Sequence, residues 1–180
     1  MQHPADHSPL GKSSEYVSVY SPDLLFPIPR ANKWAELGLE SGSLPYHGVD
    51  VWNCYELSWL TPSGKPVVAI GEFVIPADSP NIIESKSFKL YLGSFAQTKL
   101  ANVDAARALI QQDLSEAAGA AVQVRLVEPA AFVKLELDEL DGLLVDRLDI
   151  ETDVYAPDAT LLKAAQGVTS LAEINRVTKD

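Results

Sequence analysis

Residues 51–60 read VWNCYELSWL, residues 66–76 read PVVAIGEFVIP, and the stretch TPSGK joins them at 61–65. Both longer runs are rich in β-branched and aromatic residues, which favour strands. The joining stretch has the length and the proline and glycine content of a hairpin loop. Together the three stretches predict an antiparallel β-hairpin.

Two helical patterns follow the hairpin. The first opens after a turn at 78–81, and the second runs from a cap at Asn102 or Asp104 to Gly119. Apolar residues at helical spacing predict the face that each helix turns to the core. In the first helix this stripe consists of Ser85, Phe88, Leu92 and Phe95.

Alternating apolar residues predict two more strands, at 121–127 and 131–137, on either side of Pro129. The order of elements is therefore β-β-α-α-β-β. Two hairpins separated by a pair of helices indicate the α+β class.

The segments on either side of this core module are less regular. Residues 1–48 are rich in proline and glycine but too apolar for a free tail, which predicts an arm packed on the core. A short helix is expected at 33–39. The core module is expected to span 49–162, with a further strand at 146–154, and residues 163–180 are expected to form a divergent helical tail.

Composition excludes several functional classes. The 180 residues carry 14 Lys and Arg against 25 Asp and Glu, a net charge of −11, which argues against nucleic-acid binding and anionic membranes. No apolar run has the length of a membrane span, and the start lacks a signal-peptide pattern. A single cysteine and three histidines without metal-ligand spacing predict no disulfide and no metal site. We expect a cytoplasmic protein.

Residues 84–91 read ESKSFKLY and gather cations on this acidic chain. Lys86 and Lys89, three residues apart, are expected on one face of a helix whose N-terminus favours anions, so phosphate is the indicated ligand class. The alternative is a solvated helix face. Ser85 and Ser87 fit helix capping and phosphate contact equally well.

Glu84 and Cys54 also have two interpretations each. The Glu84 carboxylate can complement the N-terminus of the helix, or it can accept paired N–H donors from a guanine-type ring. Cys54 lies within a predicted strand without a cation beside it in the sequence, which is typical of a structural thiol rather than a nucleophile.

Residues 79–91, SPNIIESKSFKLY, resemble the signature of the NADPH-dependent 7-cyano-7-deazaguanine reductases. These nitrile reductases belong to queuosine biosynthesis, a pathway of tRNA modification. The similarity runs from the N-terminus to about Leu162. Further stretches similar to the two-module form of the family are 10–12 with 15–16, 44–50 and 51–60.

The resemblance implies the tunnelling fold (T-fold). In this fold an antiparallel sheet of the order β-β-α-α-β-β carries two helices on one face, and modules join their sheet edges into homo-oligomers. It also implies that Glu84 holds the deazapurine ring of the substrate, with Ile83 and Ser85 beside it. Ser85 and Lys86 are implied to contact the cofactor NADPH, and we extend this contact to Lys89.

The family's catalytic groups have no match in these 180 residues. The C-terminal module of the two-module form supplies a cysteine that forms a thioimide with the nitrile, a proton-donating aspartate, a His-Glu pair for the substrate and an Arg-Gly pair for NADPH. Cys54 does not lie where the family places its nucleophile. We therefore predict no catalytic residue in this chain and no activity of the chain alone.

Three interpretations follow. In the first, the chain is the N-terminal module of a nitrile reductase, and a partner chain or a downstream segment supplies the missing module. In the second, it is a T-fold binding or assembly module without reductase activity. In the third, it is a secretion-related adaptor, because residues 167–180 resemble the C-terminal end of pilus-assembly and type II secretion ATPases.

Overall fold

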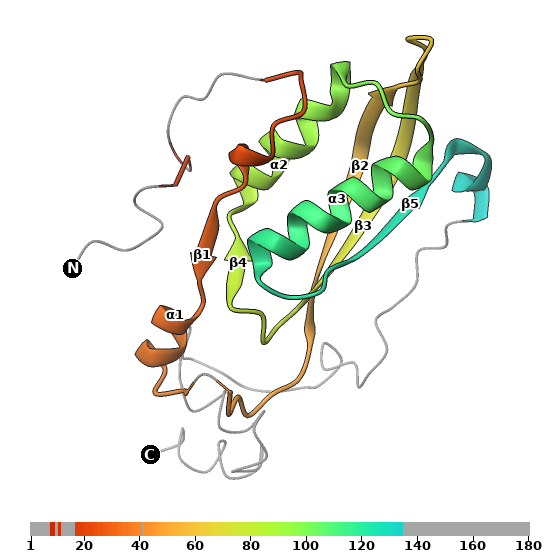
Figure 1. The fold of residues 1–180 in the computed structure, drawn as a ribbon. Coiled ribbons are helices and arrows are strands. Elements are labelled where there is room, and N and C mark those ends of the chain that lie inside the picture. The colour runs from red at the N-terminus through yellow and green to blue at the C-terminus, as the bar shows by residue number, and fades with distance from the viewer. Residues whose placement is uncertain (1–7, 10, 12–16, 41, 135–180) are drawn as a thin grey trace, which may run out of the picture. The chain divides into compact units, whose positions relative to one another are not determined.

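A computed structural model describes residues 8–9, 11, 17–40 and 42–134. Its main sheet is three-stranded and antiparallel, in the order β2-β3-β5 (Figure 1). The strands are β2 (Val49–Leu60), β3 (Pro66–Pro76) and β5 (Gln123–Val127). The predicted hairpin is therefore confirmed.

Strand β2 has an irregularity that the alternating pattern does not reveal. Its register with β3 runs regularly from Val49 to Cys54, which faces Gly71, and then resumes at Leu57, which faces Ala69. Tyr55 and Glu56 of β2 thus oppose Ile70 of β3, two residues against one, which is a β-bulge. Past the bulge, Leu57 and Trp59 point into the core and are almost fully buried.

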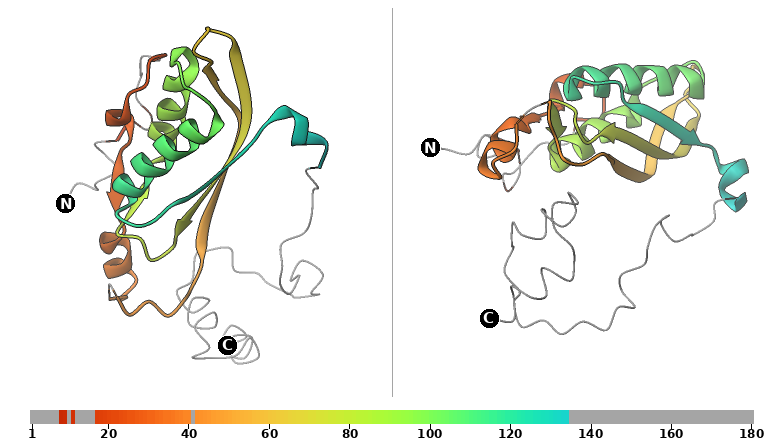
Figure 2. Two further views of the ribbon diagram at one scale, coloured as in Figure 1. Left: turned by 45° about the vertical axis from the view of Figure 1, so that its right-hand side comes forward. Right: turned by 90° about the horizontal axis from the view of Figure 1, so that it is seen from below.

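Two helices cover one face of this sheet, α2 (Ser85–Gly93) and α3 (Val103–Ala118), as Figure 2 shows. Asn102 caps α3 by accepting the Ala105 N–H at 2.8 Å, and Gly119 ends it with φ at 70°. Phe88, Leu92 and Phe95 are buried, as the stripe on the first helix predicts. Ser85 does not belong to that stripe, because it is exposed in the first turn of α2.

The prediction of a strand at 131–137 is wrong over the residues that the structure describes. A 3₁₀ helix, η4 (Pro129–Lys134), replaces it, and Ala131 N–H donates to Glu128 O at 2.9 Å. The fixed φ of Pro129 suits the first turn of a helix, and proline has no N–H to donate to a neighbouring strand. Residues 135–137 lie outside the described residues.

The arm before β2 runs beside α2. Its short strand β1 (Pro27–Pro29) pairs antiparallel with β4 (Asn81–Ile83), and α1 (Ala31–Glu36) follows, two residues earlier than the expected helix. A 3₁₀ turn, η2 (Pro22–Leu24), precedes β1, and a second, η3 (Ser94–Gln97), continues α2. The neighbouring side chains of Tyr20, Leu24 and Leu25 pack against the hydrophobic core, which includes Tyr91 and Phe95.

A partly buried carboxylate fastens this arm to the helices. Asp113 of α3 accepts hydrogen bonds from the hydroxyls of Tyr20, at 2.9 Å, and Tyr91, at 2.6 Å. Tyr20 also packs edge-on against the ring of Phe95 at 5.3 Å. The arm is thus held by polar and aromatic contacts at the same place.

Chain contacts divide the protein into two units, residues 1–133 and 134–180. The strand expected at 146–154, the boundary at 162 and the tail at 163–180 fall outside the described residues. Within the described ranges, none of the helices is long and apolar enough to cross a membrane. Those ranges also hold no group of His, Cys, Asp and Glu side chains arranged for a metal ion.

Candidate functional site

The N-terminus of α2 is built around Glu84. This residue directly follows β4 and keeps an extended backbone, with φ at −66° and ψ at 134°. Its Oε1 accepts the Lys86 N–H at 2.7 Å and its Oε2 accepts the Ser87 N–H at 2.8 Å. These are the second and third N–H groups of the helix, so Glu84 acts as an N-cap. The capping interpretation of this carboxylate is confirmed.

The Glu84 carboxylate keeps little unused hydrogen-bonding capacity. The Ser85 hydroxyl also donates to Oε1, at a longer 3.3 Å. With the two N–H donors, this contact takes three of the roughly four acceptor positions of a carboxylate. Glu84 is 5% exposed, so a ligand would reach it only at its remaining acceptor position or by displacing the Ser85 hydroxyl.

The two serines of the signature have different surroundings. Ser87 is fully buried, donates to Glu84 O at 2.7 Å and accepts the Phe26 N–H at 3.1 Å. It therefore joins α2 to the arm. Ser85 is exposed and is the serine that a ligand can contact.

The two lysines of the signature lie in different places. Lys86 Nζ donates to Pro9 O of the arm at 3.0 Å. Lys89 is exposed and lines a cavity together with Ser85, one turn before it. The structure thus brings Ser85 and Lys89 together, but it does not place Lys86 at that cavity.

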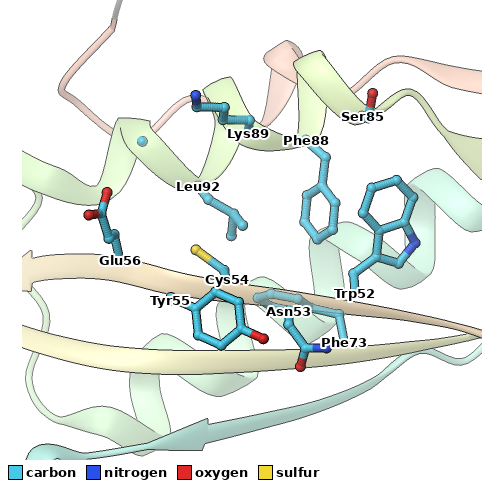
Figure 3. Close-up of a pocket in the computed structure, with 11 residues that line it drawn as sticks. Trp52, Asn53, Cys54, Tyr55, Glu56, Phe73, Ser85, Phe88, Lys89 and Leu92 are labelled. Carbon is cyan, nitrogen blue, oxygen red and sulfur yellow. The ribbon is translucent and has the colours of Figure 1, made fainter.

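This cavity lies between β2 and α2 and has a volume of about 620 Å³. Figure 3 shows the Phe88 ring pointing from α2 toward the sheet, with Trp52 beside it. The centroid of the Phe88 ring lies 5.6 Å from that of Trp52 and 5.1 Å from that of Phe73, and both pairs are edge-on. The walls consist of Trp52, Asn53, Cys54, Tyr55, Glu56, Phe73, Ser85, Phe88, Lys89, Leu92 and Gly93.

Cys54 lines the cavity as a partly buried thiol. Burial is the main cause that raises the pKa of this thiol above its usual value. Because the thiolate is the nucleophile, a raised pKa lowers the reactive fraction at neutral pH. These surroundings support the interpretation of Cys54 as a structural thiol.

Sequence reasoning missed the strand side of the cavity. The residues concerned are Trp52 and Phe73, which face each other across the hairpin, and Glu56, which lies in the bulge. The available signal was Gly71 in the middle of an apolar strand, because glycine in a strand often marks a bulge or a close approach.

Comparison with known proteins places this chain in a family. Residues 16–126 match the family model described as "Nitrile reductase, 7-cyano-7-deazaguanine-reductase N-term". Three curated relatives carry the name NADPH-dependent 7-cyano-7-deazaguanine reductase. The protein of Burkholderia cenocepacia (strain HI2424) is 60% identical over 162 residues, which is 90% of this chain and 58% of the relative.

The other two are nearly as similar. The Cupriavidus metallidurans protein is 59% identical over 169 residues, covering 93% of this chain and 61% of its own length. The Ralstonia nicotianae protein is 58% identical over 175 residues, covering 97% and 63%. The chain therefore spans about three fifths of the length of these relatives. The chain belongs to the nitrile reductase family through its 7-cyano-7-deazaguanine-reductase N-terminal domain.

Proposed function

We propose that this chain is the N-terminal module of an NADPH-dependent nitrile reductase that converts 7-cyano-7-deazaguanine to its aminomethyl product. Its role is to bind the nucleobase and part of the cofactor. The observation that carries the proposal is the N-terminus of α2, where the Glu84 carboxylate is buried and fixed by two backbone N–H groups inside the segment that matches the family. A carboxylate held in this way presents its acceptors in one orientation.

Glu84 is the residue that recognises the deazapurine ring in this proposal. A carboxylate offers two acceptor oxygens to paired ring N–H donors. The long contact from the Ser85 hydroxyl is the weakest of the three that Glu84 receives. The arriving ring takes the place of this hydroxyl. Ser85 then turns toward the ligand, and Ile83 lies beside the ring with its side chain buried in the core.

NADPH is the cofactor in this proposal, and it supplies hydride when bound. The residues at the start of α2 fit its anionic part, because Ser85 offers a hydroxyl and Lys86 and Lys89 offer ammonium groups near a helix N-terminus. Lys86 and Ser85 are proposed to contact the cofactor at the α2 terminus. NADPH as a reductant and an unpaired cysteine both suit the cytoplasm, where we propose that the protein works.

The reductive chemistry requires groups from outside this chain. Cys54 has a raised pKa and lies against Leu92 in an apolar cavity, which does not suit a nucleophile. The chain alone should therefore leave NADPH absorbance unchanged when it is mixed with 7-cyano-7-deazaguanine and NADPH. NADPH oxidation by the wild type that Cys54→Ala abolishes would contradict this division of labour.

The outer edge of β2 is the proposed surface for joining another module. Among the described strands, β2 pairs with β3 alone and ends the sheet order. It is twelve residues long, and Val49, Val51 and Tyr55 are more than half exposed. A long, apolar edge strand tends to pair with another chain. Sedimentation should show self-association of the wild type, and Val51→Lys should weaken it.

A second candidate function is binding or assembly without reductase activity. It is favoured by a formed ligand-sized cavity in a chain that spans about three fifths of its relatives. The same turnover assay separates the two functions when a lysate fraction or a purified C-terminal module is added. Restored NADPH oxidation supports the reductase module, whereas binding without restoration supports the second candidate.

A further inference from the structure

We infer that Ser87 is a positioning residue for base recognition. Its buried hydroxyl fixes Glu84 between α2 and the arm, so that the carboxylate meets the nucleobase in one place and one orientation. This role rests on the proposed function, in which Glu84 holds the ring. Its structural basis is a row of hydroxyl groups that joins the arm to α2.

Three hydroxyls along α2 and its 3₁₀ continuation make the same pair of contacts. Each one donates to a carbonyl three or four residues earlier in the chain and accepts a backbone N–H from the arm. The donated bonds run from Ser87 to Glu84 O at 2.7 Å, from Ser94 to Tyr91 O at 2.6 Å and from Thr98 to Ser94 O at 3.2 Å. The accepted N–H groups belong, in the same order, to Phe26 at 3.1 Å, Ser21 at 3.2 Å and Tyr20 at 2.8 Å.

This hydroxyl row sets the register of the arm on α2. Backbone N–H groups that leave water need hydrogen-bond partners, and these three N–H groups find theirs in side chains of the helix and its continuation. Ser87 and Ser94 are both fully buried, so water does not reach either hydroxyl to replace an arm N–H. A shift of the arm along α2 would therefore leave buried polar groups unpaired.

Ser87 differs from the other two members of the row because it holds Glu84. Its hydroxyl binds the Glu84 carbonyl, and its own N–H binds Oε2 of the Glu84 carboxylate at 2.8 Å. Phe26 completes a closed ring of hydrogen bonds, since its carbonyl accepts the Glu84 N–H at 2.9 Å. Glu84 is thus held at its N–H, its carbonyl and its carboxylate.

The position of Glu84 matters because paired hydrogen bonds tolerate little displacement. A binding group has to stay within about 0.5 Å of its productive place, and its neighbours hold it there. Without the Ser87 hydroxyl, the Phe26 N–H loses its acceptor and the Glu84 carbonyl loses one donor. The two backbone N–H groups that bind the Glu84 carboxylate remain. Ser87→Ala therefore keeps the cap and loosens its attachment to the arm.

Ser87→Ala and Ser94→Ala form a matched pair for the test. Each removes a fully buried hydroxyl that donates to the carbonyl three residues back and accepts one arm N–H, so both should lose similar stability in urea unfolding. Calorimetric titration of the full 180-residue chain with 7-cyano-7-deazaguanine measures base binding. Ser87→Ala should bind about tenfold more weakly than the wild type, as expected for the loss of one hydrogen bond. Ser94→Ala should stay within about twofold of it, as expected for a distant site.

Amide hydrogen exchange gives a second measurement, on the wild-type chain alone. If base binding requires Glu84 in place, the bound base must in turn stabilise the arm contact that holds it there. Addition of 7-cyano-7-deazaguanine should therefore slow exchange of the Phe26 N–H more than that of the Ser21 N–H, which binds Ser94. A purely structural row predicts equal slowing at the two amides.

The outcomes separate this role of Ser87 from the proposed function. Equal affinity of Ser87→Ala and the wild type, or an equal loss in Ser87→Ala and Ser94→Ala, overturns the positioning role and leaves base recognition by Glu84 standing. Equal slowing of exchange at Phe26 and Ser21 also overturns it. Wild-type binding that Glu84→Asp leaves unchanged contradicts the proposed function itself, and Ser87 then has no base-binding carboxylate to position. Absence of wild-type binding has the same consequence.

Discussion

Replacement of Glu84 should separate capping from ligand recognition. Glu84→Ala removes acceptors from two N–H groups at the start of α2, at 2.7 and 2.8 Å. Loss of an N-cap side chain costs about 0.5–2 kcal/mol. Since the N–H groups bind a buried carboxylate, we expect the upper end, about 2 kcal/mol. In a protein of this size that loss lowers Tm by about 4–8 °C.

Glu84→Asp is the matched variant. Aspartate is among the preferred N-caps and can accept the same two N–H groups, so stability should stay within about 0.5 kcal/mol of the wild type. Its carboxylate sits one methylene further from any ligand, so nucleobase binding should still be lost. Urea unfolding followed by tryptophan fluorescence measures the stabilities. Equal stability of Glu84→Ala and the wild type would refute the capping argument.

Three further changes test the surrounding structure. Gly71→Ala should displace the Phe73 ring, whose Cζ lies 2.7 Å from the new Cβ, and destabilise the protein by about 1–3 kcal/mol in urea unfolding, the usual cost of overpacking; unchanged stability would contradict this close packing. Gly119→Ala should destabilise by about 1–2 kcal/mol in urea unfolding, since φ there is 70° and Pro80 Cγ is 3.2 Å from the Cβ; a change near zero would show that the turn relaxes. Burial and then the hydrogen bond to Asp113 raise the pKa of Tyr20 to about 12 from 10.0, so its stabilisation is complete below pH 10 and lost toward pH 12. Tyr20→Phe should flatten that alkaline decline in urea stability, and an identical decline in both proteins would remove the tyrosine from the explanation.

Much of the fold follows from local patterns. The hairpin of β2 and β3 has period-two alternation with turn chemistry between its strands, and α3 has both a cap at Asn102 and a left-handed glycine at its end. These signals involve residues close in the chain. Such local signals predict a strand or a helix even when the elements that pack on it are unknown.

The remaining features depend on contacts between distant parts of the chain. Helical spacing predicts Lys86 and Lys89 on one face of the helix. In the structure Lys86 Nζ instead donates to Pro9 O, 77 positions away in the chain, and helical spacing does not reveal such a contact. The strand expected after Pro129 has the right alternation, but the structure forms a 3₁₀ turn there. The bulge beside the cavity depends on how β2 pairs with β3 around Gly71, and the alternation along β2 carries no information about that pairing.

The candidate site was only partly predictable for the same reason. The resemblance names Ile83, Glu84, Ser85 and Lys86 as one group, and the structure does place these consecutive residues at the junction of β4 and α2. It adds that Glu84 is already bound by its own helix. A carboxylate can serve as a cap and as a ligand group if the ligand uses its remaining acceptor position or displaces a weak contact, here the hydroxyl of Ser85.

Calorimetric titration of the chain with 7-cyano-7-deazaguanine tests the central claim most directly. The start of α2 as the base-recognition site predicts a binding heat for the wild type and none for Glu84→Asp, whose fold and cap stay intact. Equal heats for the two proteins would contradict that claim, because the ring would then be held without the Glu84 carboxylate.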